Sequence, residues 1–257
     1  MNKNLRIKIL DTIKKAKEGH IPSSFSIVDI LDYLYGNILN YSKKNPNKED
    51  RDFFYLSKGH ASVALFVVLN KYKLLSDDDL SSYGSLNSNL GGHPDMTKLE
   101  YVEASTGSLG HGFPTAIGTA LGLKIKNIAS KVYVLVGDGE CHEGTIWESS
   151  NIASNNELNN ICAIVDWNKS ASQLMPIENL EKKWKAFGWE VLNMNGHSLS
   201  SFKKNFKKFL NYKGKKPTVI IADTVKGKGS KLIEGHGIWH HKIPSEEEYK
   251  NILKTII

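Results

Sequence analysis

Two short polar segments of this sequence contain the residue types that bind a cation and a phosphate group. Asp138 lies in the triplet Gly-Asp-Gly at 137–139, and Asn168 follows about thirty residues later. A carboxylate and an amide carbonyl are both oxygen donors that Mg²⁺ or Ca²⁺ accepts, with backbone carbonyls and phosphate oxygens completing the shell. Gly139 leaves room for a phosphate close to the backbone. A Gly-Asp-Gly triplet alone is more often an ordinary turn, so the prediction of this site depends on the pairing with Asn168.

Histidines beside glycine or proline are the other candidates for chemistry. An imidazole titrates closer to neutral pH than any other side chain, so it can carry protons during catalysis. A single histidine is more often structural or exposed than catalytic. Four of the nine histidines, His20, His60, His93 and His240, lie in predicted loops and are the stronger candidates. The weaker candidates are His111, His142, His197, His236 and His241.

Short apolar runs alternate with helical patterns around Asp138 and Asn168. Runs rich in Val and Ile at 131–139 and 160–168 are typical of strands buried on both faces of a parallel sheet. Further strands are predicted at 189–194 and 217–223, and helices at 5–16, 26–35, 144–156, 178–187 and 199–211. This alternation predicts an α/β fold with a doubly wound, mostly parallel sheet and helices on both faces. Ligands of such sheets bind beyond the carboxyl ends of the strands, where Asp138 and Asn168 lie.

Length and composition limit the classes of protein that the chain can belong to. Its 257 residues, with 40% hydrophobic and 24% charged, exclude a disordered tail, a collagen-like repeat and a membrane span. They fit one α/β domain over 1–257 with a helical segment at the amino terminus. The net charge of +7 comes from scattered lysines, and no nucleic-acid-binding module is recognised, so we expect neither a nucleic acid nor a membrane partner. Two cysteines and no secretory signal predict a cytoplasmic protein with reduced thiols.

A series of motifs resembles the amino-terminal half of transketolases, which use thiamine diphosphate and a divalent cation. In the order of that family, the motifs are SKGHAS at 57–62, GGHPD at 91–95, STGSLGHG at 105–112, GDGECHEG at 137–144, AFGWEVLNMNGH at 186–197 and DTVKGKG at 223–229. Together with flanking segments, the resemblance covers about 18–244. The chain is most similar to the short amino-terminal subunit of two-chain transketolases, because it stops where a full-length enzyme begins its second domain.

The resemblance implies a binding role for each residue that matches a family motif. Asp138 and Asn168 are expected to bind Mg²⁺, or Ca²⁺, through their side chains, and Ser170 through its backbone carbonyl. By this resemblance, these residues would hold the metal that accompanies the diphosphate of thiamine diphosphate. The residues implied at the diphosphate itself are Gly139, His60 and His240.

The resemblance also implies contacts to the cofactor rings and to the substrate. Gly107, Ser108 and Leu109 are expected to lie against the rings of the cofactor. His20, His93 and His240 are the expected catalytic residues, which assist proton transfers at the hydroxyl groups of the donor sugar. Glu143, counted with the cofactor-binding residues, is expected to join a carboxylate network across the subunit interface.

The implied activity is transfer of a two-carbon ketol unit from a ketose to an aldose acceptor, a transferase reaction. The activating glutamate of the family belongs to the carboxyl-terminal half, and no segment of this chain resembles that half. We therefore expect activity only with a separate carboxyl-terminal-half transketolase subunit, in an α2β2 heterotetramer. The substrates are expected to be sugars or sugar phosphates.

Departures from the family pattern leave other functions open. Ile21–Ser24 follow His20 where the family usually has glycines, and His111 stands where the family usually has glutamine. The segment after Asn168 is also shorter than its usual counterpart. One alternative is a divergent thiamine diphosphate enzyme subunit that acts on a specialised sugar in a biosynthetic pathway. The others are a non-catalytic scaffold with the same fold and a synthase of the deoxyxylulose phosphate type.

Overall fold

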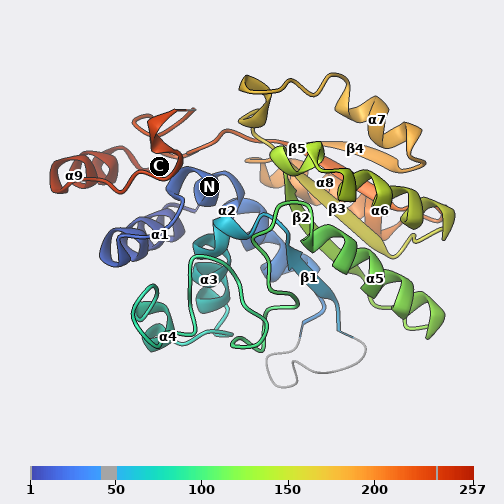
Figure 1. The fold of residues 1–257 in the computed structure, drawn as a ribbon, viewed down its shortest axis with the longest axis horizontal. Helices are drawn as coiled ribbons and strands as arrows, with labels where there is room; N and C mark the ends of the chain where they lie inside the picture. Colours follow the sequence, from blue (N-terminus) through green and yellow to red (C-terminus); the bar gives the residue numbers. More distant parts are fainter. Residues whose placement is uncertain (1, 42–50, 236) are drawn as a thin grey trace.

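The computed structural model describes residues 2–41, 51–235 and 237–257, and its centre is a parallel sheet (Figure 1). The five strands are β1 (Phe53–Leu56), β2 (Val132–Gly137), β3 (Ile161–Trp167), β4 (Glu190–Asn195) and β5 (Thr218–Asp223). Their order in the sheet is β1-β2-β3-β5-β4, and every neighbouring pair is parallel. All strands therefore end at the same edge of the sheet, which is where a doubly wound fold places its ligands.

Helices cover both faces of the sheet, as the alternation of elements predicts. The α-helices are α1 (Lys3–Ala16), α2 (Ile21–Tyr33), α3 (Ser62–Lys71), α4 (Asp77–Ser81), α5 (Gly112–Ile125), α6 (Gly144–Asn155), α7 (Leu180–Ala186), α8 (Leu199–Leu210) and α9 (Glu246–Thr255). One hydrophobic core joins the sheet to α1, α2, α3 and α8, and a second core joins it to α5, α6 and α7. Successive side chains of a strand point to opposite faces of the sheet and so enter the two cores in turn. In β2, Tyr133 and Leu135 pack in the first core, while Val134 and Val136 pack in the second. This double burial explains why the strands are continuous apolar runs.

Four strands and most of the predicted helices are confirmed, but the second helix was predicted with wrong bounds. It begins at Ile21 and not at 26, because Pro22 is well suited to the first turn of a helix. It also does not end at Gly36, since a π-helical turn, Leu34–Ile38, continues through that glycine. A side chain at position 36 would lie 2.3 Å from the hydroxyl of Tyr72, so the glycine serves a close contact and not a helix end. Strand β1, which precedes the SKGHAS motif, was not predicted because it has only four residues.

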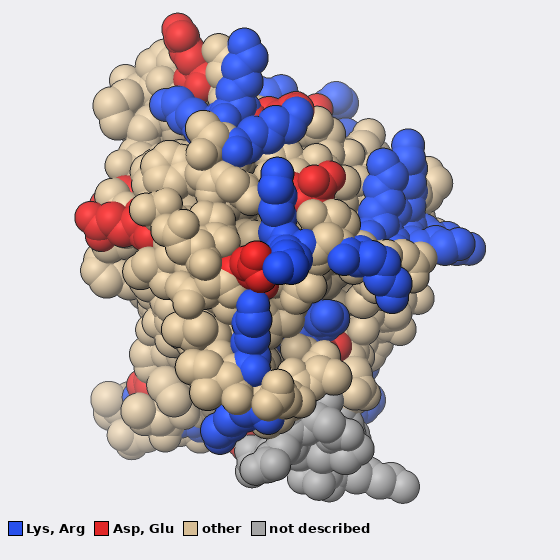
Figure 2. All heavy atoms as spheres, turned by 90° about the vertical axis from the view of Figure 1, so that its right-hand side faces the viewer, with Lys and Arg blue, Asp and Glu red and all other residues tan. Residues whose placement is uncertain are grey.

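The positive charge of the chain is spread over its surface. Figure 2 shows lysine and arginine side chains distributed across one face, with fewer acidic side chains between them. In α8, Phe202, Phe206 and Phe209 are buried, while the lysines between them are exposed. The lysines of α8 are therefore the solvated face of an amphipathic helix. Among the described residues, no helix combines the length and apolar character needed to cross a membrane.

Candidate active site

A cavity of about 350 Å³ lies at the edge of the sheet where β2 and β3 end. The ends of the two strands supply the metal-site candidates, and the other walls come from the SKGHAS segment and two later loops. The lining residues are Ser23, Lys58, His60, Leu109, Gly137, Asp138, Gly139, Glu140, Asn168, Ser170, Ala171, Leu174, Lys226 and His240. The structure thus brings together seven of the residues singled out in the sequence: His60, Leu109, Asp138, Gly139, Asn168, Ser170 and His240.

Asp138 and Asn168 lie on neighbouring strand ends with their oxygen atoms held by local hydrogen bonds. The two carboxylate oxygens of Asp138 accept hydrogen bonds from the backbone N–H groups of Gly139 and Ala171, both at 2.9 Å. The side-chain amide of Asn168 donates to Asp166 at 2.9 Å, which leaves its oxygen to accept from the Ser170 N–H at 3.0 Å. Within the described residues no three His, Cys, Asp or Glu side chains form a metal cluster. A cation here would instead need one carboxylate, one amide and backbone or phosphate oxygens, a set that suits Mg²⁺.

A buried ion pair supports the floor of the cavity. Lys58, from the SKGHAS motif, lies 2.5 Å from Asp166 of β3, and both side chains are almost fully buried. Burial alone would raise the pKa of Asp166, but the charge and hydrogen bond of Lys58 hold it below its usual value. Ser26 and Asn168 also donate to this carboxylate, at 2.8 and 2.9 Å. Asp166 is therefore an ionised carboxylate that orients Asn168.

Lys226 is a cation in the cavity that has no acidic partner among the described residues. Its ammonium donates to the hydroxyl of Ser170 at 2.6 Å and to Nδ1 of His240 at 2.9 Å. Burial, followed by the nearby charge of Lys58, lowers the pKa of Lys226. Because the charge of Lys58 is balanced by Asp166 and that of Lys226 is not, the cavity favours an anion beside Lys226.

Three histidines gather at one side of the cavity. The ring centroid of His20 lies 5.2 Å from that of His60 and 5.3 Å from that of His240. Burial, then the charges of His241 and other neighbours, lowers the pKa of His20 to about 3. Burial, then the charge of Lys58, lowers the pKa of His60 to about 2, and burial also lowers that of His240. All three rings are therefore neutral near pH 7 and can accept or donate a hydrogen bond at either nitrogen according to their tautomer.

His93 lies beside the Gly107–Leu109 loop and outside the set of residues that line the cavity. An added Cβ on Gly107 would lie 2.8 Å from Cδ2 of His93, so the ring covers the glycine. Gly107 also has a φ of 145°, which other residues rarely adopt. The hydroxyl of Ser108 is within 3.1 Å of Nδ1 of His111, the residue that departs from the family pattern. The structure thus brings His93 to the predicted ring-contact loop.

A buried glutamate that sequence reasoning missed joins this loop to the end of β2. Glu140 accepts hydrogen bonds from the hydroxyl of Ser57 at 2.6 Å and from the N–H groups of Gly110 and Gly137 at 2.8 and 2.7 Å. The predicted Glu143 is only partly buried and lies against Gly110 instead of lining the cavity. Position 140 was overlooked because its partners come from three separate segments, whereas Glu143 was singled out by resemblance alone.

Other missed residues had signals that could have found them. Lys58 and Lys226 both lie inside motifs that we quoted, SKGHAS and DTVKGKG, and are the lysines of those motifs that reach the cavity. His241, which we ranked as weak, has its ring centroid 4.6 Å from that of His20. His236 lies outside the described residues. A lysine inside a motif that is expected to bind phosphate is itself a candidate for phosphate binding, and this would have predicted both lysines.

Comparison with known families gives one match that spans the chain. Residues 1–255 match the family model described as transketolase, thiamine diphosphate binding domain. The chain is 35% identical over 256 residues to an apulose-4-phosphate transketolase subunit of Phocaeicola vulgatus, with 98% of this chain and 90% of that protein covered. It is 34% identical to the 6-deoxy-6-sulfo-D-fructose transketolase subunit SqwG of Clostridium sp., covering 96% of this chain and 91% of that protein.

Longer relatives and solved structures match over part of their length. Human transketolase is 34% identical over 258 residues, which is 98% of this chain but 41% of that protein. The crystal structure of transketolase from Campylobacter jejuni superimposes with a TM-score of 0.90 at 33% identity, covering 99% of this chain and 43% of that one. Transketolase from Leishmania mexicana gives a TM-score of 0.89 at 27% identity over 97% of this chain and 40% of that one. The chain thus spans about two fifths of these relatives.

Proposed function

This chain belongs to the transketolase thiamine diphosphate-binding family, and we propose that it is the amino-terminal subunit of a split transketolase. It transfers a two-carbon ketol unit from a ketose to an aldose acceptor, together with a carboxyl-terminal-half subunit. The observation that carries this proposal is the cavity that gathers Asp138, Asn168, His60 and His240 at the ends of β2 and β3. A scaffold protein has no need for this set of residues together, which favours the enzyme over that alternative.

The donor atoms in the cavity fit a diphosphate with a divalent cation. Asp138 and Asn168 would supply side-chain oxygens to Mg²⁺, with the backbone carbonyl of Ser170 as the third protein ligand. Gly139, His60, His240 and the unbalanced charge of Lys226 would hold the diphosphate of the cofactor. The buried Nδ1 of His20 has no hydrogen-bond partner among the residues that the structure describes, which also supports a ligand close by. Thiamine diphosphate, when bound, supplies the carbon centre at which the two-carbon unit is carried.

The histidines handle protons and hydroxyl groups of the donor sugar. His20 and His240 are neutral near pH 7, because burial lowers the pKa of both, so His20 can accept a hydrogen bond from a sugar hydroxyl and His240 can donate one through its remaining ring nitrogen. Nδ1 of His240 accepts from Lys226, which places the ring hydrogen on Nε2. His93 lies at the loop of Gly107, Ser108 and Leu109 that contacts the cofactor rings, and it orients the sugar on that side. Glu143, beside the same loop, faces the partner subunit.

An apolar rim around the cavity supports a partner subunit. We use this term for Leu109, Leu174, Met175 and Ile238, which are 39%, 93%, 56% and 75% exposed. Leu109 and Leu174 line the cavity itself, and Ile238 lies in the short helix that contains His240. A carboxyl-terminal-half subunit that covers the rim removes these side chains from water and completes the active site, in an α2β2 assembly.

The sugar is a specialised one, by analogy with the subunit relatives whose names contain apulose-4-phosphate and 6-deoxy-6-sulfo-D-fructose. Both names describe a sugar with an anionic group, phosphate or sulfonate, at the end of the molecule. The proline at position 22 and His111 both lie close to residues of the site, and they shape the cavity for this substrate. The two cysteines are buried and free, which fits a cytoplasmic enzyme.

The test is an assay of the purified chain with and without its partner. We would combine it with a carboxyl-terminal-half transketolase subunit encoded by a neighbouring gene, Mg²⁺ and thiamine diphosphate, and measure ketol transfer from a panel of ketose phosphates. Transfer by the pair and none by either chain alone is the expected result. Transfer by this chain alone would contradict the split enzyme, and no cofactor binding by the pair would contradict the proposed function as a whole.

A further inference from the structure

The segment that carries Lys226 has no regular secondary structure, yet two side chains contact its backbone on either side of this lysine. Nε2 of His197 accepts a hydrogen bond from the N–H of Val225 at 2.9 Å. Nε of Arg6 donates to the carbonyl oxygen of Lys228 at 2.7 Å. The two side chains come from distant parts of the sequence, Arg6 from α1 and His197 from the connection between β4 and α8.

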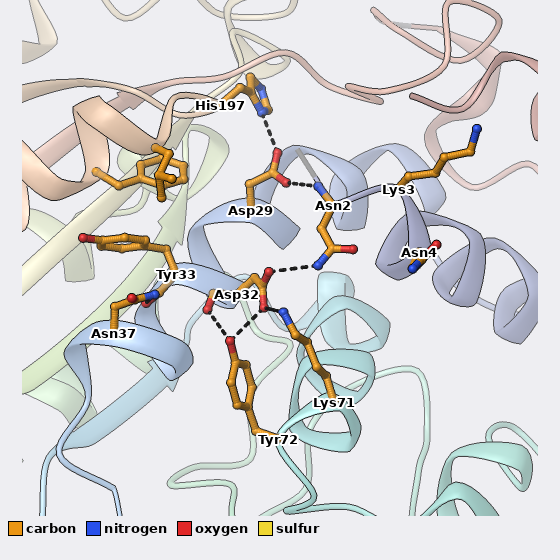
Figure 3. A pocket seen from close by; sticks show the side chains of 12 residues that line it. Asn2, Lys3, Asn4, Asp29, Asp32, Tyr33, Asn37, Lys71, Tyr72 and His197 are labelled. Carbon is orange, nitrogen blue, oxygen red and sulfur yellow. Dashed lines mark hydrogen bonds and ion pairs between the residues drawn. The ribbon is translucent and has the colours of Figure 1, made fainter.

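A single buried carboxylate joins these two contacts. Asp29 of α2 accepts from Nη1 and Nη2 of Arg6 at 3.0 and 2.7 Å. Asp29 also lies 3.4 Å from Nδ1 of His197, as Figure 3 shows. Because Nε2 of His197 accepts from Val225, the hydrogen of the neutral ring is on Nδ1 and points to Asp29. Burial would raise the pKa of Asp29, but the hydrogen bonds from His197 and Arg6 hold it well below its usual value. Asp29 is thus an ionised group that orients both neighbours.

The cavity next to Asp29 does not present a competing ligand site. It has a volume of about 460 Å³ and contains Asp29, Asp32 and His197 (Figure 3). Asp32 already accepts from Asn2 at 3.1 Å and from Tyr72 at 3.0 Å, and it pairs with Lys71. Since the acidic groups have partners inside the chain, their role here is structural support.

We propose that Arg6, Asp29 and His197 form a positioning cluster that sets the place of the Lys226 ammonium in the cavity. The inference rests on the proposed function, because it assumes that Lys226 meets an anionic group there. Gly227 and Gly229 have φ values of 77° and 116° and give the segment conformational freedom, which the cluster restricts. His197 contacts the backbone of Val225, the residue directly before Lys226. Losing this hydrogen bond should therefore displace the Lys226 ammonium.

The remaining contacts of the segment explain why it can stay folded without His197. The hydroxyl of Thr224 donates to Asp166, and the N–H of Gly227 donates to the carbonyl of Pro22 at 3.0 Å. The carbonyl of Lys226 also accepts from the N–H of Gly235 at 2.9 Å. Removing the His197 contact should therefore shift the local backbone without unfolding the segment.

The test uses His197→Phe, which keeps a ring but removes the acceptor, and His197→Gln, whose amide can accept from Val225 and donate to Asp29. We would titrate the full chain, alone and with its partner subunit, with thiamine diphosphate in excess Mg²⁺ by calorimetry. His197→Phe should raise the Kd about tenfold, the equivalent of one lost hydrogen bond, and His197→Gln should stay within about twofold of the wild-type Kd. Ser201→Ala is the matched control, because Ser201, at the start of α8, accepts from the N–H of Asn195 at the end of β4 without contacting Val225.

The outcomes separate this inference from the proposed function. If the wild-type chain binds no thiamine diphosphate even with its partner, both fail. If it binds and His197→Phe binds equally well, or His197→Gln is as weak as His197→Phe, only the positioning cluster is wrong. An equal loss of affinity in Ser201→Ala would also overturn it, since the effect would then be a general loosening. Should His197→Phe not fold in urea titrations, His197→Asn, too short to reach both partners, replaces it.

Discussion

The ammonium of Lys58 lies 2.5 Å from a carboxylate oxygen of Asp166, and each side chain is at most 1% exposed. Lys58 is the second residue after β1 and also lines the cavity, and Asp166 is the last residue but one of β3. Its carboxylate also accepts from Thr224, at the start of the segment that carries Lys226. The stability of the domain and the order of its cavity therefore depend on the same two charges.

Replacing Lys58 with Met should destabilise the domain by about 3 to 5 kcal/mol, because Asp166 then remains buried without its partner. Urea denaturation of the two proteins measures this difference. Lys182→Met is the control, since Lys182 is exposed on α7 and makes no ion pair with the described residues, and it should change stability by less than about 0.5 kcal/mol. A loss below about 1 kcal/mol for Lys58→Met would show that the pair is not an essential support.

Asp138→Asn should lower the affinity for thiamine diphosphate in the presence of Mg²⁺ about 100-fold, or about 2.8 kcal/mol, because it removes the only carboxylate proposed to bind the metal. Chelation of the metal by EDTA should weaken binding to the wild-type chain to a similar extent. Calorimetry of the chain with its partner subunit measures both effects. Asp223→Asn, an exposed carboxylate at the end of β5, is the matched control and should bind normally. Unchanged affinity in Asp138→Asn would remove this residue from the metal site.

The stability of the ligand-free chain should fall as the pH decreases from about 6.5 toward about 4. The pKa values of His20 and His60 are lowered in the folded state, to about 3 and about 2, mainly by burial. The unfolded chain therefore binds more protons in this range, and each histidine adds a slope of at most about 1.4 kcal/mol per pH unit. The contribution of His20 is smaller, because its pKa is lowered less than that of His60.

The measurement is urea denaturation at several pH values for the wild type, His60→Gln and His20→Gln. Each substitution should reduce the dependence of the unfolding free energy on pH, and His60→Gln should reduce it more. Identical slopes in all three proteins would mean that neither ring is held neutral by its surroundings.

Gly107→Ala should lower ketol transfer by at least about tenfold and destabilise the domain by about 1 to 2 kcal/mol, since it combines a φ of 145° with a clash against His93. Gly118→Ala in α5 is the control, because an added Cβ there meets no atom within 4 Å. It should be neutral or stabilise the helix by up to about 1 kcal/mol. Steady-state kinetics with the partner subunit and thermal unfolding measure the two effects. Normal activity in Gly107→Ala would separate His93 from the reaction.

Helices and strands with a regular spacing of apolar residues could be predicted from the sequence. The strands that end at Gly137 and Trp167 are continuous apolar runs, since both faces of the sheet are covered, and the motifs then place Asp138 and Asn168 at one edge. Glu140 could not be found in this way, because three donors from distant segments determine its role. The same is true of His197, which was only a weak candidate until Asp29 and Val225 were seen beside it. Tertiary contacts between loops have no period in the sequence.

A chain without its proposed partner leaves the apolar rim uncovered in the cell. Leu174, at 93% exposure, and its neighbours on the rim would be in contact with water whenever the chain is made in excess of its partner. Such surfaces promote self-association, so unpaired copies should be recovered as aggregates or degraded by proteases. Balanced synthesis of the two subunits is then a requirement for yield, and expression from one transcript is the arrangement that meets it.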